Sequence, residues 1–468
     1  MNKIYEQNYS KFIEPIYGKR REVNYDKKLE KDVDFHSFTI KDRINMEHID
    51  SYTIDPDGCE DADDAFSIYE NANKIYLAIH IADPTEYIPI ESNIWKDIMK
   101  RITTKYPSNR EPIHMMPKKV LELSSLQENS YGSIKNSITI LTEISNKTYL
   151  PLNNVKLLFT TINVKNSNKY SYKNASINKN KIYDFEIGLK ISEALKKKRA
   201  KLTTGFKLNE LSISYPIYED NIVYLYQDTN DEKLIKQMIA EFAIFANSFI
   251  GAYLKINLNE GIFRTCNANK WLDNIYPDIS GEELLKGIIQ NGIKADYMAN
   301  ISPHDLVGMP EYCHFTSPIR RLSDCVCHYL LKYIFLKNNG AKKPFTSEEL
   351  DEISNKCYIT TRNDKKNQYL DIKFRLIQVM NNMIIKRKKI NISYYISGYT
   401  GLFLNIIINK INNFKIHMSY SIMIKNYQNI INPNEIFYLE ITKINCFTKY
   451  DQGCIPELEK NILSQTIH

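Results

Sequence analysis

The sequence lacks the features of a membrane or secreted protein. It contains no run of eighteen consecutive apolar residues, which a membrane-spanning helix would need. Its N-terminus has no apolar segment of the length found in secretory signals. The eight cysteines include no C-x-x-C pair, which disfavours a disulfide framework or a zinc site and favours free thiols in a reducing cytosol. We therefore expect a cytoplasmic protein that does not associate with a membrane.

The sequence also lacks internal repeats, low-complexity segments and a strong charge of either sign. Its 468 residues are 43% hydrophobic, which provides for a large core and predicts two or three domains. The net charge of +7 is small for this length, so it permits an anionic partner without requiring one. The basic run at residues 196–201 is typical of a solvated face when it is judged alone.

Hydrophobic periodicity predicts a mixture of strands and helices. Residues 65–69 and 74–81 are typical of two strands joined by the turn residues 70–73, so they predict a hairpin. Further strands are predicted at 137–144 and 155–164. Helices are predicted at residues 93–102, 184–201, 232–254, 323–336 and 347–387.

The pattern changes from about residue 390 onward. Short strand-like runs at 393–397, 401–408, 414–418 and 435–441 predict a small closed barrel of the OB type. The predicted fold class is α+β, with a mixed sheet and surrounding helices followed by a small C-terminal β-barrel. The predicted division is an N-terminal extension at 1–40, a main domain at 41–388 and the barrel at 389–468.

An acidic motif between residues 55 and 64 is the strongest chemical signal. Its six carboxylates are Asp55, Asp57, Glu60, Asp61, Asp63 and Asp64. Pro56 and Gly58 bend the chain, so these carboxylates can converge. Like charges packed together cost free energy unless a cation neutralises them. The motif therefore predicts a divalent cation site, and Mg²⁺ is the usual ion where phosphate is also bound.

Two other interpretations of the acidic motif are a solvated acidic turn and a calcium loop. A solvated turn would be the default for an isolated D-x-D-D. An EF-hand loop needs a bidentate Glu at its twelfth position and helices on both sides. Counted from Asp55, the twelfth residue is Phe66, and strands flank the motif. The sequence therefore disfavours calcium.

A second motif runs from Tyr312 to Asp324. Residues 316–318 predict a tight turn or a helix start, with Arg320 and Arg321 in the first turn of the following helix. Cations near a helix N-terminus oppose its dipole, so this placement indicates another purpose. The planar guanidinium group of arginine suits phosphate. Taken alone, the motif is equally compatible with a structural ion pair and with an anion site.

Together the two motifs resemble the RNase II/RNase R family of RNB-domain exoribonucleases, which also includes the exosome nuclease Dis3. In the family motif, a first Asp is followed six positions later by a second Asp, and then by x-Asp-Asp. Asp55, Asp61, Asp63 and Asp64 have this spacing here. Similar elements follow in family order at residues 80–83, 106–126, 171–172, 239–247, 263–264, 304 and 312–324. The resemblance covers about residues 41–335.

The resemblance implies a 3′→5′ exoribonuclease that hydrolyses single-stranded RNA to nucleoside 5′-monophosphates with Mg²⁺ or Mn²⁺. It implies an RNB-type catalytic domain, an OB/S1-like barrel and a monomer. The implied metal ligands are Asp55, Asp61 and Asp64, and the implied catalytic residues are Asp63 and Arg320. The implied RNA-binding residues are Tyr106, Tyr172, Glu241 and Arg321.

The chain departs from the family pattern at several points. Bacterial members usually carry two cold-shock domains before the catalytic domain, whereas about forty residues precede it here. We therefore expect a less enclosed RNA entrance. Leu322 and Ala240 replace a Tyr and a Glu of the family motifs.

Two other functions remain as alternatives. One is a catalytically inactive RNA-binding relative, and the other is a metal-dependent phosphodiesterase acting on another nucleic acid. The four intact aspartates and Arg320 argue against the inactive relative. They do not separate RNA from another phosphodiester substrate.

Overall fold

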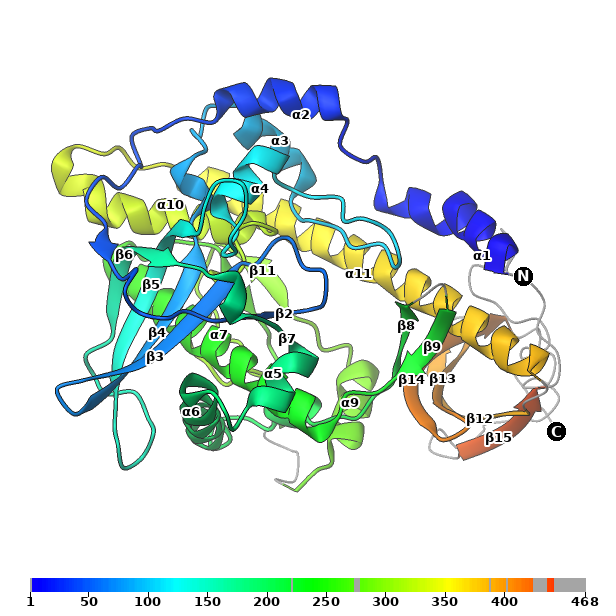
Figure 1. The fold of residues 1–468 in the computed structure, drawn as a ribbon. Coiled ribbons are helices and arrows are strands. Elements are labelled where there is room, and N and C mark those ends of the chain that lie inside the picture. Colours follow the sequence, from blue (N-terminus) through cyan, green and yellow to red (C-terminus); the bar gives the residue numbers. More distant parts are fainter. Residues whose placement is uncertain are drawn as a thin grey trace.

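The computed structural model describes residues 2–219, 222–272, 278–386, 389–400, 403–423 and 436–441. Within these ranges the chain has two hydrophobic cores. One long helix, α11 (Ser347–Ile385), runs between the two regions (Figure 1).

A five-stranded sheet forms the centre of the larger region. Its strand order is β1 (Ile44–Asn45), β6 (Lys156–Asn163), β5 (Ile134–Ile144), β4 (Lys74–Ala82) and β3 (Asp64–Asn71). The strands from β3 to β6 are antiparallel, and β1 is parallel to β6. The sheet is therefore mixed, as the sequence predicts.

The predicted hairpin is confirmed in β3 and β4. Its two-residue turn consists of Ala72 and Asn73, whose φ angles are 50° and 62°. Two consecutive left-handed residues make a turn whose twist matches that of the flanking strands. The resulting register pairs Asp64 with Ile81, so Asp64 is the first residue of β3.

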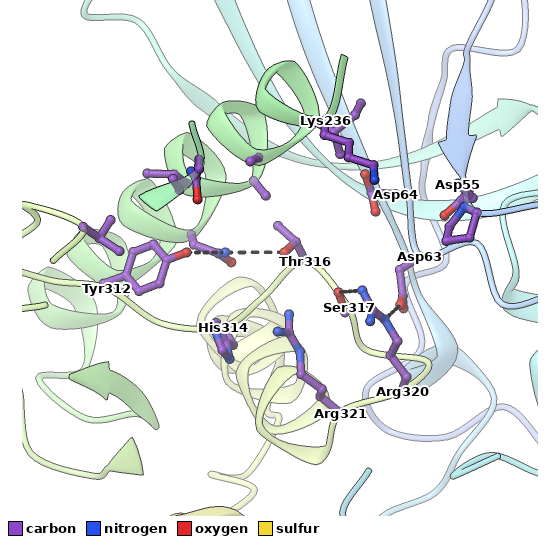
Figure 2. Close-up of a pocket in the computed structure, with 18 of the residues that line it drawn as sticks. Asp55, Asp63, Asp64, Lys236, Tyr312, His314, Thr316, Ser317, Arg320 and Arg321 are labelled. Atoms are coloured by element: carbon purple, nitrogen blue, oxygen red, sulfur yellow. Dashed lines mark hydrogen bonds and ion pairs between the residues drawn. The ribbon is translucent and has the colours of Figure 1, made fainter. Parts of the chain in front are cut away.

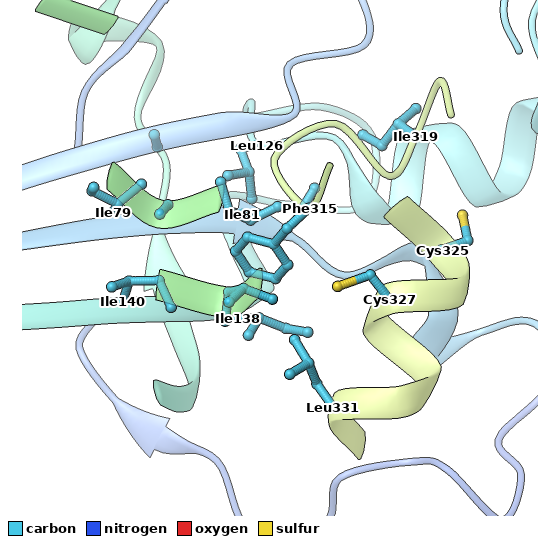
Figure 3. Packing of buried hydrophobic residues seen from close by; sticks show 14 of the residues in the cluster. Ile79, Ile81, Leu126, Ile138, Ile140, Phe315, Ile319, Cys325, Cys327 and Leu331 are labelled. Carbon is cyan, nitrogen blue, oxygen red and sulfur yellow. The ribbon is translucent and has the colours of Figure 1, made fainter. Parts of the chain in front are cut away.

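Helices cover the sheet and complete the larger core. They include α6 (Tyr183–Arg199), α7 (Asn230–Asn257) and α10 (Leu322–Leu336). Figure 3 shows isoleucines of β4 and β5 beside side chains of α10 and the segment before it: Ile79, Ile81, Ile138, Ile140, Phe315, Cys327 and Leu331. This packing fixes the segment before α10 against the ends of the strands.

The remaining elements are short, apart from the strands of the C-terminal sheet. The other helices are α1 (Asn2–Asn8), α2 (Val23–Leu29), α3 (Asn93–Arg101), α4 (Lys118–Ser124), α5 (Tyr172–Asn178), α8 (Asn269–Leu272) and α9 (Gly281–Gln290). The paired short strands are β2 (Thr53–Asp55) with β7 (Lys169–Ser171), β8 (Tyr215–Glu219) with β9 (Ile222–Tyr226), and β10 (Phe263–Thr265) with β11 (Asp296–Met298). Every helix and strand predicted from periodicity is present within a few residues of its predicted bounds in the described ranges.

Helix α7 is long and rich in apolar residues. Of the described helices, it is the one whose length and composition would allow it to cross a membrane. Its polar residues Glu241 and Asn247 are buried and form hydrogen bonds with side chains of other segments. These contacts are those of a helix in a protein core.

The second core joins both ends of the chain. The C-terminal sheet has the order β14 (Phe414–Met423), β13 (Phe403–Ile411), β12 (Ile390–Thr400) and β15 (Ile436–Ile441), and all its pairs are antiparallel. Its strands curve around each other in Figure 1, which agrees with the predicted barrel-like fold. Gly401, Leu402 and residues 424–435 and 442–468 of the predicted barrel lie outside the described residues.

The N-terminal segment packs into this second core. Tyr5, Tyr9, Ile13 and Tyr17 are buried there beside Phe374 of α11. The predicted N-terminal extension therefore packs on the body of the protein.

All described cysteines are free thiols, and they are Cys59, Cys266, Cys313, Cys325, Cys327 and Cys357. Cys446 and Cys454 lie outside the described residues.

Two isoleucines of β5 allow a matched test of the larger core. Ile138 is 0% exposed and Ile134 is 47% exposed. We expect Ile138→Ala to lower the free energy of unfolding by about 2–5 kcal/mol, because it leaves a cavity between the sheet and α10. Ile134→Ala should lower it by less than about 1 kcal/mol. Urea denaturation measures both values, and equal losses would contradict this description of the core.

Candidate active site

The loop between β2 and β3 brings the aspartates together. β2 ends at Asp55 and β3 begins at Asp64. Between them Gly58 has φ 76°, a conformation that a residue without Cβ adopts at little cost. The Ser125 hydroxyl accepts the backbone N–H of Ala62 at 3.0 Å and donates to the Glu60 carbonyl at 2.9 Å. Ser125 thus holds the part of the loop that follows the turn.

Strand pairing places a tyrosine beside this loop. β2 and β7 are parallel, and Asp55 lies opposite Ser171 in their register. The Ser171 side chain caps α5 by accepting the backbone N–H of Asn174. Tyr172 is the first residue of that helix, so it lies next to Asp55.

All but one of the predicted site residues line a single cleft of about 930 Å³ (Figure 2). They are Asp55, Asp61, Asp63, Asp64, Tyr106, Tyr172, Arg320 and Arg321. The exception is Glu241, which does not line this cleft. The two sequence motifs therefore meet in one place, where Asp63 and Ile319 are in contact although they are 256 residues apart in the chain.

Asp63 and Arg320 form an ion pair at the edge of the cleft. Arg320 Nε donates to Asp63 Oδ2 at 2.8 Å, and the backbone N–H of Ile319 donates to Asp63 Oδ1 at 2.8 Å. Arg320 also donates a hydrogen bond to the Ser317 hydroxyl at 3.1 Å. Burial lowers the pKa of Arg320, but the charge and hydrogen bond of Asp63, together with Tyr106 and Asp61, raise it, and the net direction is upward. The guanidinium group is therefore a fixed cation in the cleft.

The structure corrects the predicted position of the two arginines. α10 begins at Leu322, and Arg321 is its N-cap with φ −139°. Arg320 and Arg321 thus precede the helix and do not lie in its first turn. Asp324 occupies that turn, where a carboxylate is favoured, and it accepts hydrogen bonds from Arg321 at 2.8 Å and from Ser317 N–H at 2.8 Å.

Asp55 and Asp64 lack the strong partners that Asp63 has. The Oδ2 atom of Asp55 is buried and has no hydrogen-bond partner among the described residues. Burial and the neighbouring charge of Asp64 raise the pKa of Asp55 to about 7. Burial raises the pKa of Asp64 to about 6, although Arg320 and Arg321 oppose the shift. Both carboxylates would gain from a nearby cation.

Asp61 has a hydrogen-bond partner in Tyr106, which the family resemblance implied to be an RNA-binding residue. The Tyr106 hydroxyl donates a short hydrogen bond to Asp61 Oδ2. This bond and the Asp63–Arg320 pair provide partners for two of the four carboxylates. Accordingly, the described residues contain no group of three His, Cys, Asp or Glu side chains arranged to hold a metal ion.

The remaining pair still fits a magnesium ion. Mg²⁺ is commonly bound through one or two carboxylates, with waters and substrate phosphates supplying its other ligands. Asp55 and Asp64 offer two carboxylates, one of them with an unpaired buried oxygen. The geometry therefore favours these two as the protein ligands, whereas the Tyr106 hydroxyl already occupies one oxygen of Asp61.

Glu241 lies behind the wall of the cleft. It is 2% exposed and forms a bidentate ion pair with Arg199, at 2.5 and 3.2 Å. Arg199 itself lines the cleft. This geometry therefore does not support a direct contact between Glu241 and RNA, which the family resemblance implied. The prediction that residues 196–201 form a solvated face is wrong at Arg199, which is 3% exposed.

The sequence did not single out Lys236 and Asn247 as residues of the cleft. Lys236 lies over the ring of Tyr172, with its Nζ 5.3 Å from the ring centroid. Asn247 donates to the hydroxyl oxygen of Tyr312 at 3.1 Å and accepts from Phe315 N–H at 2.8 Å, which ties α7 to the second motif. Asn247 is the last residue of the motif at 239–247 and Lys236 lies three residues before its start, so their spacing along α7 could have indicated them.

Comparison with protein families and curated proteins yields consistent relatives. The profile of the RNB domain matches residues 43–337. Exoribonuclease 2 of Buchnera aphidicola is 27% identical over 349 residues, which cover 65% of this chain and 52% of the relative. Ribonuclease R of Helicobacter pylori is 27% identical over 393 residues, which cover 72% of this chain and 58% of the relative. The chain spans about half the length of the curated relatives it matches.

Solved structures share the fold at low sequence identity. RNase R of Mycoplasma genitalium in complex with double-stranded RNA has a TM-score of 0.72 and 18% identity, with 96% of this chain and 82% of that one covered. An active-site mutant of the Dss1 exoribonuclease from Candida glabrata has a TM-score of 0.71 and 17% identity, covering 90% and 56%. Yeast Ssd1, a pseudonuclease, has a TM-score of 0.61 and 16% identity, covering 84% and 51%.

The raised pKa values predict that cation binding depends on pH. Because the carboxyls of Asp55 and Asp64 hold protons up to pH values near 7 and 6, a cation must displace those protons. We expect Mn²⁺ affinity to rise between pH 5.5 and 7.5, with proton release on binding, as measured by calorimetry in two buffers of different ionisation enthalpy. Asp64→Asn should weaken binding at pH 7.5 at least about tenfold. Affinity that is constant across this range would contradict the assignment.

Proposed function

The chain belongs to the RNB domain family, and from this premise we propose that it is an exoribonuclease that hydrolyses single-stranded RNA from its 3′ end. The observation that carries the proposal is the meeting of Asp55, Asp64 and Arg320 in one cleft. A carboxylate pair that needs a cation, facing a fixed guanidinium group, is suited to a phosphodiester. The proposed products are nucleoside 5′-monophosphates.

The lining of the cleft supports binding of a single strand. It combines cations with tyrosines, namely Arg199, Lys236, Arg320, Arg321, Tyr106, Tyr172 and Tyr312. Cations follow a phosphate backbone, and aromatic rings stack on bases regardless of their sequence. Tyr172 beside Asp55 would thus seat a base next to the carboxylates. Contacts to the ribose 2′-OH would allow the cleft to distinguish RNA from DNA.

Arg320 would contact the scissile phosphate. Its guanidinium group donates hydrogen bonds to Asp63 and Ser317, and its backbone lies in the segment before α10. A donor that is already oriented stabilises developing negative charge without the cost of reorganisation. Asp63 would thereby act on the reaction through Arg320, while Arg321 would complete the positive wall.

Exoribonucleases of this family depend on a divalent metal ion in general. We propose Mg²⁺ here, with Mn²⁺ as the alternative, held by Asp55 and Asp64 with Asp61 as a further candidate ligand. When bound, the ion would supply activation of water and neutralisation of phosphate charge. A cytoplasmic monomer and the domain boundaries at residues 40 and 388 remain predictions.

The inactive alternative has a specific neighbour, since Ssd1 is a pseudonuclease. The present chain keeps both the carboxylate pair and the oriented arginine in one cleft, which supports the active enzyme. The second alternative is action on another phosphodiester, and only a comparison of substrates distinguishes it from exoribonuclease activity.

One assay tests these possibilities. The purified protein is incubated with 5′-labelled single-stranded RNA or DNA of the same sequence, with Mg²⁺ or with EDTA. We expect a descending ladder on RNA that requires the free metal ion, because the carboxylate pair needs a cation to approach phosphate. Equal shortening of DNA would favour the general phosphodiesterase, and RNA binding without shortening would favour the inactive relative.

The Asp63–Arg320 pair yields a sharper prediction. Arg320→Ala should lower kcat by about 100- to 1,000-fold, as the loss of an oriented donor does elsewhere, while changing the Kd for RNA far less. Asp63→Asn should also abolish most cleavage and leave RNA affinity largely intact. Because both residues belong to one unit, the double variant should be little worse than Arg320→Ala. Independent losses that multiply in the double variant would contradict the pairing.

A further inference from the structure

The segment that carries Tyr106 lies between the second motif and α11. We refer to residues 103–110 as the Tyr106 loop. On one side its backbone joins the arginines, since Thr104 N–H donates to the Arg320 carbonyl at 3.1 Å. Within the cleft, the Tyr106 hydroxyl donates to Asp61. A shift of this loop would therefore reach both a carboxylate and the arginine of the proposed site.

Three side chains on one face of α11 hold the loop from the other side. Asp364, Asp371 and Arg375 are spaced by seven and four residues, which aligns them along a helix. Asp364 accepts the hydroxyl of Thr103 at 2.7 Å, before Tyr106 in the chain. Asp371 and Arg375 bind Ser108, after Tyr106. The helix thus anchors the loop on both sides of the tyrosine.

Ser108 is the most strongly held residue of the loop. Its backbone N–H donates to Asp371 Oδ2 at 2.8 Å, and its hydroxyl donates to Asp371 Oδ1. Arg375 donates to the hydroxyl oxygen of Ser108 at 2.9 Å and to its carbonyl at 3.1 Å. All hydrogen-bonding groups of this residue are therefore paired with α11.

The N-terminal segment closes this network. The hydroxyls of Tyr9 and Tyr17 donate to Asp371 Oδ2 at 2.7 and 2.9 Å. Arg375 stacks on the ring of Tyr9, 4.1 Å from its centroid, and donates to Glu6 at 2.7 Å. Asp371 is 2% exposed and accepts four hydrogen bonds, the full capacity of a carboxylate. An Asn at position 371 would place its N–H donors against groups of Ser108, Tyr9 or Tyr17 that themselves donate hydrogen bonds.

From this geometry we propose that Asp371 is a positioning residue of the active site. It aligns Ser108, and through Ser108 it sets the place of Tyr106 against Asp61. The N-terminal tyrosines orient the carboxylate for this role. The proposal rests on the proposed exoribonuclease activity, and it assigns to α11 and the N-terminal segment a part in that activity which neither sequence motif contains.

The test compares Asp371→Asn with Asp351→Asn, a matched control on the exposed N-terminal part of the same helix. We expect Asp371→Asn to lower kcat on 5′-labelled single-stranded RNA by about 10- to 100-fold, as small displacements of catalytic groups do. KM should change by less than about threefold, because the wall of cations stays in place. Asp351→Asn should behave as the wild type.

A double-mutant cycle separates positioning from general damage. If Asp371 acts through Tyr106, Asp371→Asn should cost little in a Tyr106→Phe background, where the bond to Asp61 is already lost. A loss of the same size in both backgrounds would overturn the proposal. Tyr9→Phe with Tyr17→Phe provides a second variant that keeps the carboxylate, and it should show a smaller loss of the same kind.

Hydrogen exchange gives a readout that does not need activity. Residues 103–110 should exchange faster in Asp371→Asn than in Asp351→Asn, with unchanged exchange in β4 and β5. Unchanged exchange in residues 103–110 would overturn the proposal even if turnover fell. If the wild-type protein does not shorten RNA, the proposed function fails, and the exchange of this segment still decides whether Asp371 holds the loop.

Discussion

The repulsion among four aspartates confined in one cleft is the constraint on which the site depends. Each carboxylate meets it differently. Asp63 has a guanidinium partner, and Asp61 has a tyrosine hydroxyl. Asp55 and Asp64 are left facing each other with raised pKa values. A site built in this way is incomplete without a cation, and this division of roles distinguishes carboxylates that the sequence alone presents as equivalent.

Rigid elements of the fold hold these side chains in place despite their repulsion. The loop of the aspartates begins and ends in strands, and Ser125 fixes it in the middle. The arginine segment is held by Phe315 in the core and by Asn247 of α7. Because these supports belong to the sheet and helices of the larger core, they fix the loop residues of the site on rigid elements.

Local features of the fold and the site could be predicted from the sequence, and features formed over long distances could not. Periodicity indicated the β3–β4 hairpin and the helix capped by Thr346, because both depend on neighbouring residues. The two motifs indicated the cleft. The position of Arg320 and Arg321 in the first helical turn was predicted wrongly, because the helix begins at Leu322 with Arg321 as its N-cap. The Arg199–Glu241 pair and the Asp371 network were missed, because their partners are 42 and up to 362 residues apart and follow no periodic pattern.

The burial of Tyr9 against Asp371 has a consequence for synthesis of the chain. The carboxylate is translated 362 residues after its donor. At ordinary ribosomal rates this delay is on the order of tens of seconds, during which the four buried side chains near the N-terminus lack their contacts with α11. Completion of the network around the Tyr106 loop is thereby tied to translation of α11.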